Sequence, residues 1–499
     1  MKAMKGFLVL FLAVSCFPLW AAERVDYDLD DDGLIEIDDL YDLNDIRNNV
    51  SEGDFPQILG DKLYGSNDGC PVSGCSGYEL STDLNLDSNG NGQFDADDVF
   101  WNDGKGWDPI GSFFVKFNTE FHGNGFSITN LVMRRSGSPF SAFIAYSEFG
   151  YLHDFTITAD LVTGAESAGI LAYGWNTRLE RIKADIKITA EAADESCISK
   201  CDPQIIGSIV GSAVESELKN IVVNAQVAGS DRLGGVGGDI YDSNVGEIAV
   251  QVKLNGSDNV GGLAGSITNG VVESVAIFAD IEGRASVGGL AGSTGGTSGV
   301  NIDNVLISGT VTPGVNITRY ARGGALLGRA TSEDQIDHII STVHLPNDEE
   351  ANHFIGALIG RGDHPTINNA IWAKDLALRD TMYYEGSSRN IGQNWDLIDL
   401  QCATEANNCN GLSFNAFANE LNSESSSLWS FGETYHSPAL NLPEGRFIDS
   451  DSNGEADSWP DLQLPEVPEA TPSSSGGGMF YALLSLVLLT LRKKPFLSK

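Results

Sequence analysis

A glycine-rich pentapeptide recurs through the middle of the chain and constrains the fold more than any other feature of the sequence. Its copies, which vary from Ser-Ala-Phe-Ile-Ala to Gly-Gly-Leu-Ala-Gly, begin at Ser141, Ala168, Gly207, Gly234, Gly261, Gly288, Gly324 and Gly356. Four of the seven intervals between these starts are 27 residues long. A fixed period of this length is the signature of a stacked repeat, in which each unit contacts only its neighbours. The sequence therefore predicts one elongated repeat structure across the middle of the chain.

A second segment of each repeat alternates apolar and polar residues, as in the copy Ile221, Val223, Ala225 and Val227. Alternation with a period of two is typical of a strand with one buried face. One such unit cannot bury its apolar face alone, whereas stacked copies share a core. We therefore predict an all-β fold, a parallel β-helix (β-solenoid) with coils of about 27 residues.

Two kinds of residue are expected at the corners of each coil. The pentapeptide glycines should supply positive φ angles and allow successive coils to approach closely. Asn220, Asn304 and Asn369 stand just before the alternating segment in three copies, and asparagine tolerates the left-handed conformation of a tight turn. We expect a corner at each of these asparagines.

The pentapeptides resemble the GLUG motif, named for Gly-Leu-x-Gly, which occurs in bacterial surface proteins and around some IgA-specific metallopeptidases. The resemblance covers roughly residues 106–442. GLUG is a structural repeat, so the resemblance implies a fold and no activity of its own. The metallopeptidases need a His-Glu-x-x-His zinc helix, and none of the seven histidines is followed by Glu. Zinc peptidase activity is therefore excluded for this chain.

The start of the chain resembles a secretory signal peptide, with Lys2 and Lys5 before an apolar run. Cleavage is expected by signal peptidase after Ala21 or Ala22. The alternative is lipidation at Cys16, although the bulky apolar residues that follow it disfavour a lipoprotein cleavage box. We expect an exported protein.

The other end carries Gly476, Gly477 and Gly478, then thirteen uncharged residues over 479–491 and a basic stop. A thirteen-residue helix spans about 20 Å, which is short of the ~30 Å hydrocarbon layer. This order resembles the GlyGly-CTERM sorting tail of Gram-negative bacteria, which implies cleavage near the glycines by a rhombosortase-type protease. The resemblance implies transient anchoring in the inner membrane and a mature protein at the cell surface or outside the cell; the alternative is an ordinary single-span anchor.

An acidic segment near the start fits the twelve-residue EF-hand loop, with a glycine at the sixth position, Gly33. The ligands expected for calcium are Asp28, Asp30, Asp32, Leu34 through its carbonyl, Glu36 and Asp39. Position 12 is Asp where Glu is commoner, which resembles dockerin loops. A helix is expected over residues 40–50. The bland alternative is a solvated acidic turn.

Two further segments repeat this spacing with fewer charges. One offers Asp87, Asn89, Asn91 and Asp98, and the other offers Asp449, Asp451, Asn453 and Asp457. Both are possible calcium sites, each with the solvated turn as its equal alternative.

Six cysteines form three close pairs: Cys70 with Cys75, Cys197 with Cys201, and Cys402 with Cys409. In an exported chain, an even number of cysteines in close pairs implies local disulfides that hold loops. Zinc ligation is the weaker alternative, because no pair has nearby histidines in a metal-binding spacing.

The formal charge of −39 disfavours nucleic acid as a partner, since phosphate would be repelled. The expected organisation is a signal peptide (1–22), an acidic region with EF-hand-like loops (23–105), the solenoid (106–400), a C-terminal cap (401–463), a linker (464–478) and a hydrophobic tail with a basic stop (479–499).

The expected function is a calcium-stabilised surface or secreted module that binds, adheres or builds structure, with an extracellular glycan or protein as its ligand. The alternative is a polysaccharide-active β-helix enzyme, a lyase or glycoside hydrolase, that uses a carboxylate pair. Acids gathered with exposed aromatic rings along a groove would favour the enzyme, whereas a flat and evenly polar surface would favour the binding module.

Overall fold

The computed structural model describes most of the chain between residues 26 and 378. The described residues are 26–49, 51–52, 69–71, 74–135, 138–164, 166–190, 204–314, 321–346, 354–378, 401–402, 429–430 and 439–440. The signal peptide, the sorting tail, the pair Cys197/Cys201, Cys409 and the loop at 449–457 lie outside them.

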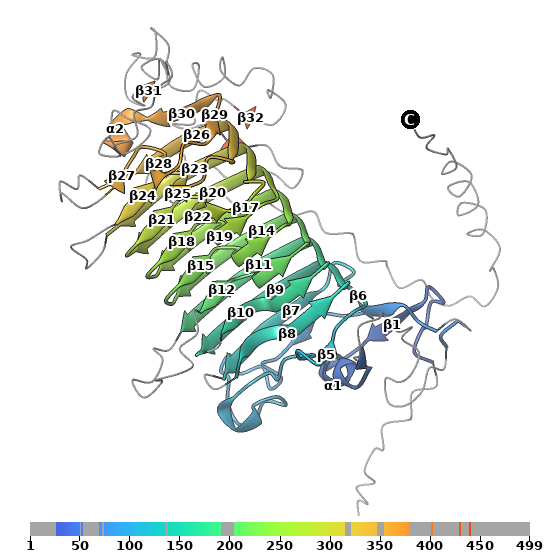
Figure 1. The fold of residues 1–499 in the computed structure, drawn as a ribbon. Coiled ribbons are helices and arrows are strands. Elements are labelled where there is room, and N and C mark those ends of the chain that lie inside the picture. Colours follow the sequence, from blue (N-terminus) through green and yellow to red (C-terminus); the bar gives the residue numbers. More distant parts are fainter. Residues whose placement is uncertain are drawn as a thin grey trace, which may run out of the picture.

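The described chain folds into a parallel β-solenoid, as the repeat predicts (Figure 1). Its first sheet contains β1 (Leu34–Ile37), β3 (Gly77–Leu80), β4 (Leu84–Asn85), β6 (Glu120–His122), β7 (Ser127–Arg134), β9 (Tyr151–Thr163), β11 (Arg178–Ala190), β14 (Glu217–Ala228), β17 (Asn244–Asn255), β20 (Val271–Gly283), β23 (Asn301–Pro313), β26 (Gln335–His344), β29 (Thr366–Ile367), β30 (Ala370–Ala373) and β31 (Gln401–Cys402). The pairs between these strands are parallel, so each coil lies beside the next in one register.

The second sheet has two arms that meet at β10 (Ser167–Trp175), which also pairs with β8 (Phe140–Glu148). One arm contains β12 (Ile205–Gly207), β15 (Arg232–Gly234), β18 (Asn259–Gly261), β21 (Ser286–Gly288), β24 (Arg322–Gly324) and β27 (Phe354–Ile355). The other contains β13 (Val210–Val214), β16 (Gly237–Tyr241), β19 (Ala264–Thr268), β22 (Ala291–Gly295), β25 (Leu327–Ala330) and β28 (Ile359–Gly362). In each later coil the pentapeptide separates the two arms and forms a corner.

The core is a continuous apolar column inside the coils. The third pentapeptide residue is fully buried in six successive copies: Ile209, Val236, Leu263, Leu290, Leu326 and Leu358. The alternating residues of the long strands face the same interior, as Ile221, Val223 and Val227 do in β14. Burying these side chains supplies the main driving force for stacking.

The corner glycines differ in one respect from the expectation. None of the pentapeptide glycines adopts a positive φ angle. They are needed only for close approach: a Cβ on Gly261 would lie 2.2 Å from the Ala264 carbonyl oxygen and 2.4 Å from Cα of Ala291 in the next coil. The prediction of positive φ angles at the pentapeptide glycines is therefore wrong, and the prediction of close approach is confirmed. Backbone contact with the neighbouring coil is sufficient to require glycine at these positions.

A second corner of each coil, where the backbone has a positive φ angle, interrupts the long strands. We call it the left-handed corner, and residues other than glycine occupy it. The asparagine prediction is confirmed, with φ angles of 53° at Asn220, 55° at Asn304 and 44° at Asn369. The same corner is occupied in other coils by Asp154, Arg181, Glu247, Ser274 and His338, all with positive φ. Stacking on both sides therefore imposes this conformation even on residues that do not favour it.

The parallel ladder begins before residue 106, where the sequence analysis places the start of the solenoid. β1 pairs with β3, and β3 pairs with β6. The helix expected over residues 40–50 is α1 (Leu40–Asp45) followed by a 3-10 turn, η1 (Ile46–Asn49). The remaining short elements are β2 (Ser51–Glu52), η2 (Asn102–Gly104), β5 (Val115–Lys116), α2 (Lys374–Ala377), β32 (Trp429–Ser430) and β33 (Ala439–Leu440). Within the described residues, no helix has the length and apolar character to cross a membrane.

Candidate functional site

The first acidic loop curls around its own carboxylates and ends in β1. The backbone N–H of Gly33 donates to Asp28 Oδ2 at 2.9 Å, and the N–H of Leu34 donates to Asp32 Oδ1 at 2.8 Å. Gly33 has a φ of 94°, which explains why glycine occupies the sixth position. The loop therefore has the turn that the EF-hand spacing predicts.

Carboxylate oxygens converge on this loop from two coils. Asp28, Asp30 and Asp32 each offer an oxygen within 4.8 Å of the others, and Asp30 forms a second group of this kind with Glu36 and Glu79. Glu79 belongs to β3, where it lies directly beside Glu36 of β1 in the parallel register. Sequence reasoning missed Glu79. The weak signal was the similar pattern of Leu34–Ile37 and Gly77–Leu80, each with an acid at its third position.

Two of the expected ligands are placed differently. Asp39 is in neither carboxylate group: it caps α1, where its Oδ1 accepts from the N–H groups of Tyr41 and Asp42 at 2.7 and 3.0 Å. Asp thus serves as an N-cap, a common role for this residue. Leu34, expected to offer its carbonyl, is the first residue of β1 and pairs with Gly77.

The donors at this loop suit a hard cation. Asp28 is 1% exposed, and its Oδ1 has no hydrogen-bond donor. Burial raises the pKa of Asp28 and of Asp30, and burial together with the charges of Asp32 and Asp30 raises the pKa of Glu79 to about 8. Carboxylates that lie this close together, with Asp28, Glu36 and Glu79 buried, repel one another unless a cation lies between them. An all-oxygen donor set fits calcium better than a transition metal.

A disulfide holds the segment that packs against this loop. Cys70 and Cys75 are joined, as predicted, and Cys75 Sγ lies 3.8 Å from Asp28 Oδ2. For the other two pairs the prediction stands untested, because Cys197, Cys201 and Cys409 lie outside the described residues and the side chain of Cys402 is not described.

The second acidic loop is closed by its own hydrogen bonds. Asp87 accepts from the N–H of Asn91 at 3.2 Å and of Gly92 at 2.8 Å. Asp98 accepts from the N–H of Ser88 at 2.9 Å. The side-chain amides of Asn89 and Asn91 both donate to Asp95. Asp87, Asp95 and Asp98 do not form a carboxylate group of the kind seen at the first loop.

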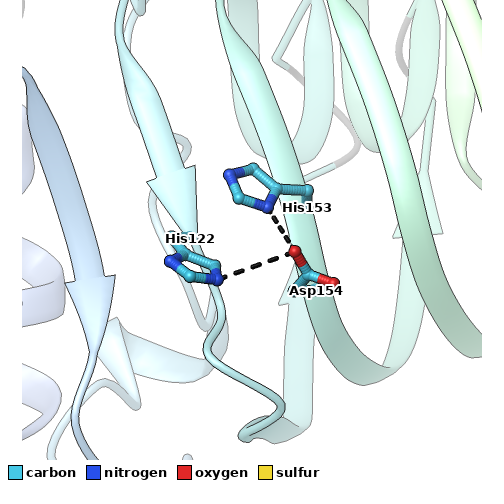
Figure 2. Close-up of side chains that lie close together, drawn as sticks. All are labelled: His122, His153 and Asp154. Atoms are coloured by element: carbon cyan, nitrogen blue, oxygen red, sulfur yellow. Dashed lines mark hydrogen bonds and ion pairs between the residues drawn. The ribbon is translucent and has the colours of Figure 1, made fainter. Parts of the chain in front are cut away.

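A second polar cluster, which the sequence analysis did not identify, lies at the left-handed corner of the next coils (Figure 2). His122 of β6 and His153 of β9 are stacked, with ring centroids 4.4 Å apart. His153 Nδ1 lies 2.5 Å from Asp154 Oδ2, and His122 Nε2 lies 3.6 Å from the same oxygen. The register pairs the two histidines directly, which is why residues so far apart in sequence meet here.

The cluster is enclosed by further charged groups. His153 Nε2 is 2.9 Å from Glu120 Oε1, so both ring nitrogens of His153 contact carboxylates. The guanidinium of Arg181 donates to both oxygens of Asp154, at 2.5 and 2.6 Å. His153 and Asp154 are 5% and 2% exposed. A network of this kind ties three coils together through mutually satisfied charges, with His153 and Asp154 buried at its centre.

The distances in this cluster do not fit a tetrahedral zinc ion. The ligands of a tetrahedral zinc ion lie about 2.0–2.1 Å from the metal, so two of them stand more than 3 Å apart. The 2.5 Å separation of His153 Nδ1 and Asp154 Oδ2 is a hydrogen bond, and Arg181 already donates to both oxygens of Asp154. We therefore interpret the cluster as an ionic clasp between coils, and we call it the corner clasp (Glu120, His122, His153, Asp154 and Arg181).

The charges of the corner clasp shift its pKa values in a consistent way. Burial by itself would raise the pKa of Asp154, but hydrogen bonds from His153 and Arg181 outweigh burial and lower this pKa to about 2. Burial would lower the pKa of His153, but its bonds to Asp154 and Glu120 raise it instead. Burial and the neighbouring His153 lower the pKa of His122. His153 is thus favoured as a cation and His122 as a neutral ring.

Asp154→Asn is expected to lower the free energy of unfolding by about 3 kcal/mol, because Arg181 and His153 lose a buried counter-ion while the left-handed corner keeps a suitable residue. The contribution of Asp154 is present above its unfolded pKa near 4 and is lost as pH falls through about 2. That of His153 is present below its unfolded pKa near 6.5 and is lost as pH rises through its raised value. Denaturant unfolding of both proteins across pH should show the largest difference between about pH 4 and 6.5. A difference that is constant across pH would contradict the clasp.

Comparison with known proteins does not assign a family. A scan against models of known protein families finds no match, and no curated protein sequence matches the chain.

Proposed function

We propose that this protein is an exported β-solenoid that binds calcium at its N-terminal end and acts outside the cell as a binding, adhesive or structural module. The observation that carries the proposal is the convergence of Asp28, Asp30 and Asp32 around a buried, unpartnered carboxylate oxygen of Asp28. This convergence occurs at β1, the first strand of the described ladder, where a cation would hold β1 against β3.

The proposed ligands are Asp28, Asp30, Asp32 and Glu36 from the loop, joined by Glu79 from the neighbouring coil. Calcium accepts six to eight oxygen ligands in a flexible geometry, which suits carboxylates contributed by two strands. Bound calcium would neutralise the buried carboxylates and join β1 to β3. The cation would therefore have a structural role.

The cellular location of the protein is proposed from the signals in its sequence. The signal peptide and the disulfide between Cys70 and Cys75 are consistent with an oxidising compartment. The resemblance of the pentapeptides to GLUG repeats and of residues 476–499 to a GlyGly-CTERM tail supports a Gram-negative cell surface. Signal peptidase and a rhombosortase-type protease are the proposed processing partners.

Calcium binding is tested directly by titration calorimetry on protein first stripped with chelator. We expect saturable binding, with a dissociation constant in the range from about 10⁻⁷ to 10⁻³ M that is typical of sensor and extracellular sites. Asp30→Asn should weaken binding at least about tenfold, because Asp30 belongs to both carboxylate groups. Asp31→Asn is the matched control, since Asp31 is in the same loop but in neither group. Equal binding isotherms for Asp30→Asn and Asp31→Asn would contradict the proposed site.

The sorting tail is tested by intact-mass analysis of protein recovered from the surface or medium of a native-like host. We expect the mature chain to begin at Ala22 or Glu23 and to end near Gly476–Gly478. Recovery of chains that still carry residues 479–499 would instead indicate a plain membrane anchor.

A polysaccharide-active enzyme is the second candidate function. The observation that favours it is a groove in which carboxylates and aromatic rings lie together, beside the second acidic loop. The corner clasp is a poor catalytic site, because His153 and Asp154 are already saturated by ionic partners. Release of reducing sugars from polysaccharides would separate the two candidates.

A further inference from the structure

A groove of about 760 Å³ lies between the second acidic loop and the outer face of β7, β9 and β11. Its size falls within the range of about 300–1,000 Å³ typical of small-molecule sites. One wall is aromatic and the other is polar, so the groove can contact an apolar surface and a polar surface of the same ligand.

The aromatic wall consists of Phe94 and Trp101, whose ring centroids are 4.6 Å apart at an angle of 50°. Both rings are half-buried, so each keeps an accessible surface. The segment that carries Trp101 is attached to β7: the N–H of Arg134 donates to the Lys105 carbonyl at 2.9 Å, and the N–H of Trp107 donates to the Val132 carbonyl at 2.9 Å. The wall is therefore held against the solenoid before any ligand arrives.

The polar wall presents acceptors and donors from adjacent coils. Arg134 of β7 forms an ion pair with Asp160 of β9 at 2.9 Å. Asp185 and Lys187 of β11 are exposed, and the register places Lys187 beside Asp160. These carboxylate, guanidinium and ammonium groups project from strands, so their positions are fixed by the ladder.

We propose that this groove binds the sugar units of an uncharged polysaccharide, with one ring face against Phe94 and Trp101 and the hydroxyl groups on Arg134, Asp160, Asp185 and Lys187. A sugar ring has an apolar face of C–H groups that packs on an aromatic surface and a rim of hydroxyls that both donate and accept. The mixed charges of the polar wall suit hydroxyls. Acidic polysaccharides are disfavoured because the chain carries a formal charge of −39. This inference deepens the binding role proposed above and rests on it.

The test is affinity electrophoresis of the full mature protein in calcium, in native gels that contain a β-glucan, a xylan, a galactomannan or polygalacturonate. We expect at least one of the three neutral polysaccharides to retard the protein and polygalacturonate to leave its mobility unchanged. Trp101→Ala should raise the apparent dissociation constant at least about tenfold, as is typical when an aromatic ring that packs against the ligand is removed. Phe114→Ala is the matched control, because Phe114 is 78% exposed and does not line the groove. Asp185→Ala is a second groove variant at an exposed position, in case Trp101→Ala fails to fold.

The outcomes separate this inference from the calcium proposal. Retardation that both groove variants weaken and Phe114→Ala preserves would support the groove. Retardation by none of the neutral polysaccharides, or retardation that the groove variants leave unchanged, would overturn it, even if the protein still binds calcium. Stronger retardation by polygalacturonate would also overturn it. Sugar release from the same polysaccharides at catalytic rates would overturn a purely binding role and make the groove an active site.

Discussion

Saturating calcium is expected to raise the free energy of unfolding by about 2.7 kcal/mol when the free ion is at 100 times its dissociation constant. The reason is that the carboxylates of Asp28, Asp30 and Glu79 converge only in the folded protein, so the ion binds the native state and not the unfolded chain. Thermal unfolding in chelator and in a series of calcium concentrations measures the effect. A melting temperature that does not rise with calcium would contradict a structural site.

Glu79 allows a more specific test of the stabilisation by calcium, because this ligand comes from the neighbouring coil. Glu79→Gln should reduce the calcium-induced shift, since one charged ligand is lost while the side chain keeps its size. In chelator the same variant should be as stable as the unmodified protein or more stable, because Glu36 and Glu79 stand side by side with buried carboxylates. Asp31→Asn again serves as the control. If Glu79→Gln keeps the full calcium response, the ion does not join the two coils.

The solenoid itself could be predicted because its signals are local. The alternation around Ile221 lies within one coil, and the 27-residue spacing of Gly234 and Gly261 is the length of one coil; stacking buries the apolar faces that these patterns mark. The disulfide between Cys70 and Cys75 was predictable for the same reason, since its cysteines are five residues apart. Each of these features needs no knowledge of which coils are neighbours.

The left-handed corner was predictable only in part. Asparagine marks it in three coils, but Glu247, Ser274 and His338 occupy the same place with φ angles of 55°, 58° and 49°. These residues have no strong preference for that conformation. The strands before and after the corner are paired in register with both neighbouring coils, and this pairing determines the backbone. Tertiary contacts thus override the local propensity of the residue.

The candidate sites required contacts between coils that the sequence does not show. Glu120 and His153 are 33 residues apart, and Asp154 and Arg181 are 27 residues apart. Glu79 joins the first acidic loop only because β3 pairs with β1 across a long connection. Irregular lengths before Gly207 and after Gly288 prevent a simple count from identifying which residues become neighbours. The spacing of the EF-hand loop was visible, but its partner from the next coil was not.

Gly261→Ala is expected to have one of the larger effects of a single added methyl group in the described coils, a loss of about 3 kcal/mol in the free energy of unfolding. The new Cβ would lie 2.2 Å from the Ala264 carbonyl oxygen and 2.4 Å from Cα of Ala291. Both neighbours are backbone atoms, so no side-chain rotation can relieve the overlap. The coils would have to move apart, and the hydrogen bonds between them would lengthen.

Gly295→Ala is the matched control, because it adds the same methyl group to a glycine in the next coil of the same sheet. Its Cβ would meet only Thr268 Oγ1, at 3.5 Å, which is an ordinary contact. This variant should remain within about 1 kcal/mol of the unmodified protein and could gain stability from a less flexible unfolded chain. Denaturant unfolding of the two variants, followed by circular dichroism, measures the difference.

The position of Gly261 also predicts how the damage spreads. In a stacked repeat each coil is stabilised by its interfaces with two neighbours, so a weakened interface in the middle divides the stack. Gly261 lies in β18, between β15 and β21. We expect Gly261→Ala to broaden or split the unfolding transition and to admit proteolysis near residue 261, whereas Gly295→Ala should unfold in one step. A single sharp transition for Gly261→Ala, at the stability of the control, would show that the close approach of these coils is not what requires glycine.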